Sequence, residues 1–195
     1  MLEKIYQLRR QAKQDGEPVL REKSFELLLD TIREKRPKKI LEVGTNVGLS
    51  SVSMLLASPT STLTGIEIDE DTKRKAEEHY KMFGVNDRAK IFLGDASEII
   101  PILTGGYDFI FLDGPKGHYY EYLLNLLPLL NKGGILFADN VLFNGYVFSK
   151  EKTPKKHNTI KNSMERFLTA ITTDKTLKTT VYQLEDGVSI TEKLI

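Results

Sequence analysis

The sequence predicts an α/β protein built on a mostly parallel, seven-stranded sheet with helices on both faces. Five short apolar runs alternate with longer amphipathic segments, and successive βα units of this kind form a parallel sheet. Each of these five runs ends in or beside an acidic residue, at the sheet edge where such folds bind ligands. Two further runs flank Glu185-Asp186-Gly187, a hairpin signal, so an antiparallel pair is expected to close one edge of the sheet.

The composition limits the class of protein. With 195 residues, 40% of them hydrophobic and 28% charged, the chain is expected to form one globular domain, residues 1–195. The net charge of +1 gives no overall attraction to nucleic acid or to membranes. The absence of cysteine excludes disulfides and thiolate metal sites and fits a cytoplasmic protein. No signal region is expected at the N-terminus and no apolar run approaches the ~20 residues that span a bilayer, so no membrane partner is expected.

Two helices are expected before the first strand. Residues 2–13 alternate apolar and basic positions as a short amphipathic helix does, and residues 15–18 form a turn. In residues 24–35, Phe25, Leu28 and Ile32 fall on one helical face, and Pro37 ends the helix.

The stretch 38–50, KKILEVGTNVGLS, is the centre of the predicted fold. Its apolar run is a buried strand that Gly44 ends, and a helical pattern to about Ala57 follows. Such a turn presents unpaired backbone N–H groups that can hold a polar or anionic cofactor. The turn lacks the middle glycine of the dinucleotide motif and the Lys-Ser/Thr pair of a P-loop, and tight packing of helix on strand remains an alternative. Glu42 favours a cofactor, because a buried strand seldom carries an unpaired carboxylate without a use for it.

The remaining elements follow in regular order. Expected strands are residues 62–68, 89–93, 107–112, 135–138, 177–184 and 188–192, and expected helices are residues 71–83, 96–103, 118–130 and 158–171. Gly133-Gly134 is expected to turn into the fifth strand, and residues 149–157 form a lysine-rich loop.

Acidic side chains mark the carboxyl ends of the five parallel strands: Glu42, Glu67, Asp95, Asp113 and Asp139. The alternative explanation is that each caps the following helix. Glu67 lies 23 residues beyond Gly44, where a carboxylate can accept both hydroxyls of a ribose, which predicts an adenosine-containing cofactor.

A metal site is predicted where Asp113, Asp139 and Asn140 meet at neighbouring strand ends. Oxygen ligands without histidine or cysteine favour Mg2+, which keeps coordination positions open for substrate. Lys116 follows Asp113 by three residues and would stand beside that metal, where the cation disfavours a charged ammonium, so it is a candidate general base. The alternative is a surface lysine in a Gly-Pro turn.

Together, ILEVGTNVGLSS, GIEID, GDA, FLDGPKGHYYEYL and GGILFADNVLFNG resemble the cation-dependent O-methyltransferases that use S-adenosyl-L-methionine, the catechol O-methyltransferase family. The resemblance runs from about Gly16 to the C-terminal strand and implies a Rossmann-like class I methyltransferase fold. It implies that Asp113, Asp139 and Asn140 hold Mg2+ and that Lys116 is the base. The cofactor-binding residues that it implies are Leu20, Glu42, Gly44, Thr45, Asn46, Ser50, Glu67, Ile68, Asp95, Ala96 and Asp113.

Within that family, K-G-x-Y and D-N-V-L-F-x-G resemble the bacterial tRNA 5-hydroxyuridine methyltransferases. This implies methyl transfer to 5-hydroxyuridine at the wobble position of tRNA, giving 5-methoxyuridine. A basic cluster of Lys150, Lys152, Lys155 and Lys156 lies beside the predicted metal site, whereas a cluster over residues 33–39 is expected at the far end of the sheet.

Alternatives remain open. One is O-methylation of a small catechol-type phenol, and another is a non-catalytic module that binds the cofactor. The chain has no tryptophan, unlike the animal catechol enzymes, which place one beside the catalytic lysine. Its N-terminal region is shorter than the family's, which bears on the contacts of the homodimer that is also expected.

Overall fold

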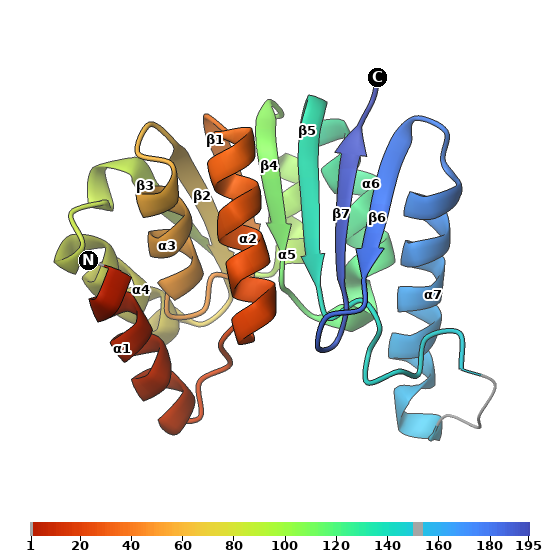
Figure 1. Ribbon diagram of the computed structural model, residues 1–195, viewed down its shortest axis with the longest axis horizontal. Helices are drawn as coiled ribbons and strands as arrows, with labels where there is room; N and C mark the ends of the chain where they lie inside the picture. The colour runs from red at the N-terminus through yellow and green to blue at the C-terminus, as the bar shows by residue number, and fades with distance from the viewer. Residues whose placement is uncertain (1, 150–153) are drawn as a thin grey trace.

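The computed structural model, which describes residues 2–149 and 154–195, confirms the predicted sheet (Figure 1). Within this part of the chain seven strands form one sheet in the order β3-β2-β1-β4-β5-β7-β6. Strands β1 to β5 run parallel, and β7 is antiparallel to β5 and to β6. The strands are β1 (Lys39–Val43), β2 (Thr62–Glu67), β3 (Ala89–Leu93), β4 (Tyr107–Leu112), β5 (Leu130–Asp139), β6 (Leu177–Tyr182) and β7 (Val188–Lys193).

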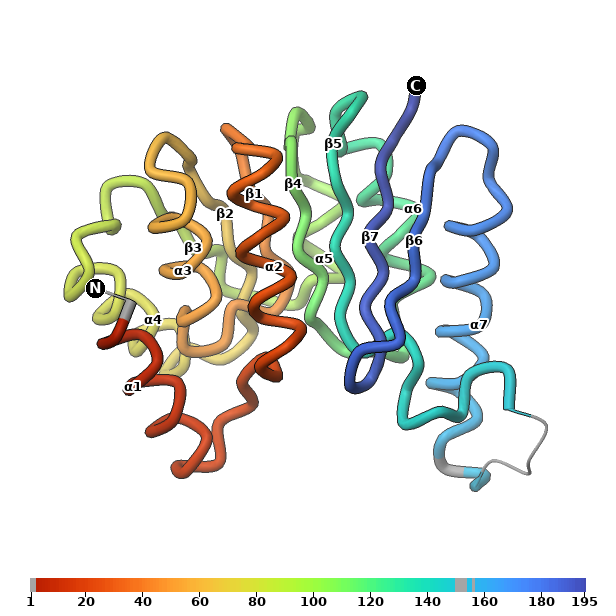
Figure 2. The backbone as a smooth tube through the Cα atoms, in the orientation of Figure 1, coloured from red at the N-terminus to blue at the C-terminus, as the bar shows by residue number. Residues whose placement is uncertain are grey.

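Helices cover both faces of this sheet, as Figures 1 and 2 show. One face carries α1 (Leu2–Gln14), α2 (Glu22–Lys35), α3 (Leu49–Ala57) and α4 (Glu70–Met82). The other carries α5 (Ala96–Ile99), α6 (Tyr119–Leu129) and α7 (Asn158–Thr173). Short 3-10 turns are η1 (Asn86–Arg88), η2 (Ile100–Ile102), η3 (Lys116–His118) and η4 (Lys155–His157).

Strand β4 shows why a continuous apolar run suits the middle of this sheet. Successive side chains of a strand point to opposite faces. Phe109 and Phe111 therefore enter the core beneath α2 and α3, whereas Ile110 and Leu112 enter the core beneath α6 and α7. All four side chains are fully buried, so the sheet separates two apolar cores.

Two element boundaries differ from the sequence prediction by more than two residues. Strand β5 begins at Leu130 and not at Ile135, because buried Leu130 already pairs with Tyr107 of β4; the register then shifts, and pairing resumes between Phe109 and Ile135. The helix predicted for residues 96–103 ends as α5 at Ile99, and η2, which contains Pro101, replaces its second half. Proline lacks the N–H that an α-helix requires, which accounts for the change.

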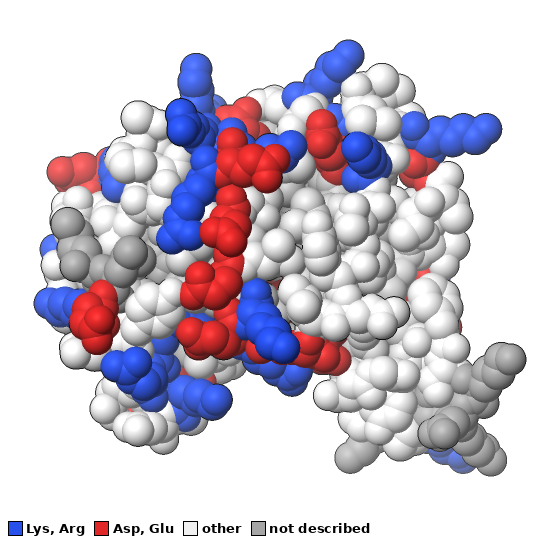
Figure 3. All heavy atoms as spheres, viewed as in Figure 1, with Lys and Arg blue, Asp and Glu red and all other residues white. Residues whose placement is uncertain are grey.

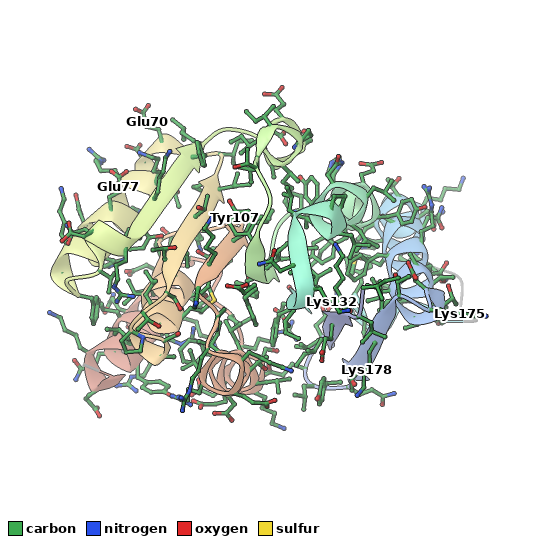
Figure 4. All side chains as sticks on the ribbon, turned by 90° about the horizontal axis from the view of Figure 1, so that it is seen from above. Glu70, Glu77, Tyr107, Lys132, Lys175 and Lys178 are labelled. Atoms are coloured by element: carbon green, nitrogen blue, oxygen red, sulfur yellow. The ribbon has the colours of Figure 1, made fainter. Side chains whose placement is uncertain are left out.

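The two ends of the sheet have different characters. The carboxyl ends of β1 to β5 meet at one end of the sheet. The opposite end carries, as expected, the exposed basic cluster Arg33, Lys35, Arg36, Lys38 and Lys39. Figure 4 views the molecule from that other end, with Tyr107 at the start of β4 and Lys132 near the start of β5. No helix among the described residues is long and apolar enough to cross a membrane.

Candidate active site

A cavity of about 540 Å³ lies at the carboxyl ends of the parallel strands. It brings together most of the residues that the sequence singled out. Those on its wall are Leu20, Gly44, Asn46, Glu67, Ile68, Asp95, Ala96, Asp113, Lys116, Asp139 and Asn140. They come from every parallel strand end, which is where α/β sheets of this kind place their ligands.

Three predicted cofactor residues do not line this cavity. Glu42 is fully buried behind it and accepts a hydrogen bond from the Ser51 hydroxyl. Burial raises the pKa of Glu42 to about 8, against the opposing effect of that hydrogen bond. Thr45 and Ser50 border an adjoining hollow of about 20 Å³, whose wall also includes Leu20 and Gly44.

The turn at Gly44 requires glycine. Its φ of +89° is a conformation that side-chain-bearing residues avoid. A Cβ atom there would lie 2.9 Å from the carbonyl carbon of Asp113 and closer still to its oxygen. The glycine therefore lets the β1 turn approach the end of β4, which brings the predicted cofactor turn against the predicted metal site.

Glu67 has a structural role that the sequence did not reveal. One of its carboxylate oxygens accepts the backbone N–H of Asn46 at 2.7 Å, and the other accepts those of Ile68 and Asp69 at 2.9 and 3.0 Å. The end of β2 is thereby tied to the glycine turn. A carboxylate has about four acceptor positions, so these three bonds leave acceptor capacity for a ribose hydroxyl.

The helix-cap alternative applies to Asp95. Its carboxylate accepts the backbone N–H and the hydroxyl of Ser97, both at 2.7 Å, and Asp95 is the N-cap of α5 while it also lines the cavity. Helices α3 and α6 have Gly48 and His118 as their N-cap residues, and neither helix has a side-chain cap. Capping therefore does not account for Glu42 or Asp113.

Asp113 and Asp139 form the electrostatic centre of the site. Burial and, to a smaller extent, the charge of Asp139 raise the pKa of Asp113 to about 7, against the opposing effect of the Lys116 charge. Burial likewise raises the pKa of Asp139 to about 6, against a hydrogen bond from the Asn140 backbone. The positive charge near the two carboxylates is therefore too small to offset the cost of burying them in ionised form.

The donors at this centre fit a hard cation. Oδ1 of Asp139 is buried and has no hydrogen-bond partner within the described residues. Asn140 adds an amide oxygen from a left-handed backbone conformation with φ of 56°, which asparagine tolerates. Nowhere in the described residues, this site included, do three or more His, Cys, Asp or Glu side chains form a group that could hold a metal, so the Asn140 amide would have to serve as the third protein ligand.

Tyr119 positions the two strand ends that carry these aspartates. Its buried hydroxyl lies 3.1 Å from the carbonyl oxygens of both Leu112 and Asp139. A single hydroxyl proton is therefore shared between the ends of β4 and β5. The apolar pattern of α6 gave no sign of this role.

Apart from Leu20, the residues of the loop before α2 that line the cavity were not predicted from the sequence. They are Pro18, Val19 and Arg21. The Asn46 amide donates to the Pro18 carbonyl, and the Arg9 guanidinium to the Leu20 carbonyl, each at 2.6 Å. No sequence motif marks the loop, because it reaches the site through helix packing.

The fold and the cavity define a class of enzyme, and comparison with known proteins identifies that class. The O-methyltransferase family model matches residues 6–194, and the chain belongs to this family. It is an S-adenosylmethionine-dependent O-methyltransferase.

The individual proteins that match this chain share between 23% and 36% sequence identity with it. The chain is 30% identical over 185 residues to the Dictyostelium discoideum protein named probable caffeoyl-CoA O-methyltransferase 3, covering 87% of this chain and 72% of that protein. It is 36% identical over 127 residues to catechol O-methyltransferase of Sus scrofa, covering 60% of this chain and 68% of that protein. The fold matches the O-methyltransferase TomG of Streptomyces achromogenes, solved with SAM, at a TM-score of 0.87 and 23% identity, covering 98% of this chain and 89% of that one.

Proposed function

We propose that this enzyme methylates 5-hydroxyuridine at the wobble position of tRNA, giving 5-methoxyuridine, with Mg2+ as its metal. The observation that carries the proposal is the meeting of two groups of residues on one cavity wall. Gly44, Glu67 and Asp95 lie on the same wall as Asp113, Lys116, Asp139 and Asn140. Cofactor and acceptor would therefore meet at the ends of β1 and β4.

The cofactor residues follow from this arrangement. Glu67 accepts the ribose hydroxyls, while Ile68, Asp95 and Ala96 surround the adenine. The methionine end extends past Gly44 towards Leu20, Asn46 and the hollow bordered by Thr45 and Ser50. Glu42 supports the turn from behind, since it is buried and does not reach the cavity.

Asp113, Asp139 and Asn140 would hold Mg2+. When bound, the ion supplies positive charge that lowers the pKa of an acceptor hydroxyl. The partnerless Oδ1 of Asp139 and the raised pKa values of both aspartates support this role, because each indicates unbalanced negative charge. Lys116 would accept the hydroxyl proton in its neutral form, which a neighbouring cation favours, and the cavity walls would hold methyl donor and acceptor oxygen in line.

We place the RNA acceptor on the Lys116 side of the cavity, where η3 packs against α7. Helix α2 carries a row of acidic side chains on its exposed face, which repels phosphate (Figure 3). In contrast to α2, the loop over residues 149–157 is rich in lysine, and it follows the proposed metal ligand Asn140 in the sequence. Of that cluster, Lys155 is exposed, whereas Lys150, Lys152 and the side chain of Lys156 lie outside the described residues.

A small catechol-type phenol is the second candidate acceptor. The names of the curated relatives favour it, since they include catechol and caffeoyl-CoA O-methyltransferases. The 5-hydroxyl and 4-carbonyl of 5-hydroxyuridine and the two hydroxyls of a catechol both present oxygens on neighbouring carbons. The same three metal-site residues could therefore serve either acceptor.

The test uses labelled S-adenosylmethionine with tRNA containing 5-hydroxyuridine, or with a catechol panel, with and without excess chelator. The proposal expects labelled tRNA and loss of transfer on chelation. Methylation of catechols without methylation of this tRNA would overturn the RNA acceptor, and full activity in chelator would overturn the metal.

A second arm tests the basic cluster. Replacing Lys152, Lys155 and Lys156 with alanine should weaken tRNA methylation and flatten its salt dependence, by roughly 0.7 in log-log slope for each lost phosphate contact. Arg33→Ala, in the basic cluster at the far end of the sheet, is the control and should change neither. An unchanged salt slope in the triple variant would place the RNA elsewhere.

A further inference from the structure

We propose that Arg9 of α1 binds the carboxylate of the cofactor's methionine end and makes cofactor affinity depend on that carboxylate. The inference rests on the cofactor orientation proposed above. It assigns a binding residue to a helix that the sequence patterns connected with no function.

Arg9 is a buried cation with unused hydrogen-bond donors. Its side chain is 5% exposed, and its guanidinium stacks 3.5 Å from the centre of the Phe25 ring. Nη2 donates to the Leu20 carbonyl, whereas Nε and Nη1 have no partner within the described residues. Burying a charged group with unpaired donors is costly, which favours a ligand for them.

Nearby acidic side chains do not take up these donors. Glu22, Glu26 and Glu185 act on Arg9 through their charges. No salt bridge in the described chain includes Arg9, and two of these acids have other partners: Glu26 accepts the Tyr6 hydroxyl, and Glu185 accepts the Ser24 hydroxyl and backbone N–H. These acids therefore leave Nε and Nη1 of Arg9 buried and without a hydrogen-bond partner in the described chain.

Arg9 lines the hollow that adjoins the main cavity. That wall also includes residues 44–50, in which Gly48 is the N-cap of α3 and supplies no side-chain cap. The first N–H groups of a helix lack internal partners and favour negative charge. The hollow therefore has a guanidinium and a helix N-terminus on its wall, and its volume of about 20 Å³ admits a group of about water size, such as a carboxylate oxygen.

The methionine carboxylate is the group of the cofactor that suits this hollow. The hollow shares Leu20, Gly44 and Asn46 with the main cavity, so a ligand can extend from one into the other. With adenosine at Glu67, the opposite end of S-adenosylmethionine points towards the hollow. Arg21 is the rival cation, because it lines the main cavity. It is exposed, however, and it is absent from the wall of the hollow.

The test compares S-adenosylmethionine with decarboxylated S-adenosylmethionine by calorimetry on wild type, Arg9→Met, Arg21→Met and Arg10→Met. Methionine keeps an unbranched apolar side chain but removes the guanidinium over Phe25, and exposed Arg10 is the matched control on the same helix. We expect Arg9→Met to weaken S-adenosylmethionine binding by about 10- to 150-fold, the usual contribution of a charged hydrogen bond. Binding of the decarboxylated compound should change by less than about threefold.

An equal loss for both compounds would overturn the proposal, because Arg9 would then serve only to hold the Leu20 carbonyl. Loss of the preference in Arg21→Met alone would also overturn it. No binding of S-adenosylmethionine by wild type would instead refute the proposed function. Should Arg9→Met fail to fold, the Arg9 Nε resonance of 15N-arginine-labelled wild type gives the answer: it should shift with S-adenosylmethionine and not with the decarboxylated compound, and equal shifts would refute the assignment.

Discussion

Asp139 is the residue whose surroundings most constrain the proposed metal site. It is 3% exposed, and its Oδ1 has no partner in the described chain. Asp139→Ala should abolish turnover and magnesium binding while S-adenosylmethionine affinity stays within a few-fold, because Asp139 is assigned to the metal alone. Calorimetry with each ligand, beside a turnover assay, checks this. Residual activity near wild type would remove Asp139 from the metal site.

Glu67 combines a structural and a proposed binding role. Glu67→Ala should weaken S-adenosylmethionine binding by about 10- to 150-fold, because it loses a charged hydrogen bond to the ribose. It also loses the bonds to the N–H groups of Asn46, Ile68 and Asp69. Repeating the titration with a 2′-deoxyribose analogue separates the two effects, since a purely structural role predicts the same loss for both compounds.

Lys116 is proposed to act only when the acceptor loses its proton. Lys116→Ala should therefore lower kcat by about 10²- to 10⁴-fold with little change in cofactor or metal binding. Single-turnover kinetics at saturating substrate measures this effect. A decrease below about threefold would show that Lys116 is structural and that acidification by the metal suffices.

At the scale of elements, the contact between the β1 turn and the end of β4 depends on Gly44. Gly44→Ala should lower the free energy of unfolding by more than the ~1–2 kcal/mol that a positive φ alone costs, because the added Cβ meets the Asp113 backbone. Gly84→Ala is the matched control, since its φ is +66° and nothing lies within 4 Å of its Cβ position. Urea denaturation of both variants gives the comparison, and equal losses would mean that Asp113 moves aside at no cost.

Two opposing interactions act between the ends of β4 and β5. Tyr119 bridges Leu112 and Asp139, while the aspartates oppose one another through their charges. The same strand ends are therefore held together by a neutral hydroxyl and separated by like charge. A bound cation would remove the repulsion without disturbing the bridge.

At the scale of the whole molecule, burial of Glu42 links stability to pH. Its pKa is raised from 4.5 to about 8. The folded protein therefore binds a proton that the unfolded chain has lost, and the resulting stabilisation is fully present below pH 4.5 and disappears as pH rises through about 8. From Glu42 alone, the free energy of unfolding should fall between these values by up to about 1.4 kcal/mol per pH unit.

Glu42→Gln isolates this effect. The amide has nearly the same shape and does not titrate, so the decrease that remains in the variant measures the other groups, chiefly Asp113 and Asp139. Urea denaturation at several pH values without divalent cation gives both curves. Parallel curves for wild type and variant would show that Glu42 ionises inside the protein at little cost.

The sequence by itself determined the order of the elements and the edge where the site lies. Alternating apolar runs specify the strands, and parallel strands necessarily bring their carboxyl ends together. Asp113, Lys116, Asp139 and Asn140 could therefore be grouped from sequence alone. Gly44 could be recognised as a turn, although the pattern gave no reason why only glycine fits.

The tertiary structure decided what depends on contacts between distant segments. Arg9 reaches Leu20 because α1 packs against α2 and α3, Glu67 reaches Asn46 because β2 lies beside β1, and Glu42 turns away from the cavity towards Ser51. Neither hydrophobic period nor local motif encodes such pairs, because each is fixed by the packing of whole helices and strands. Periodicity reports which face of an element is buried, whereas the partner on that face is set by the fold.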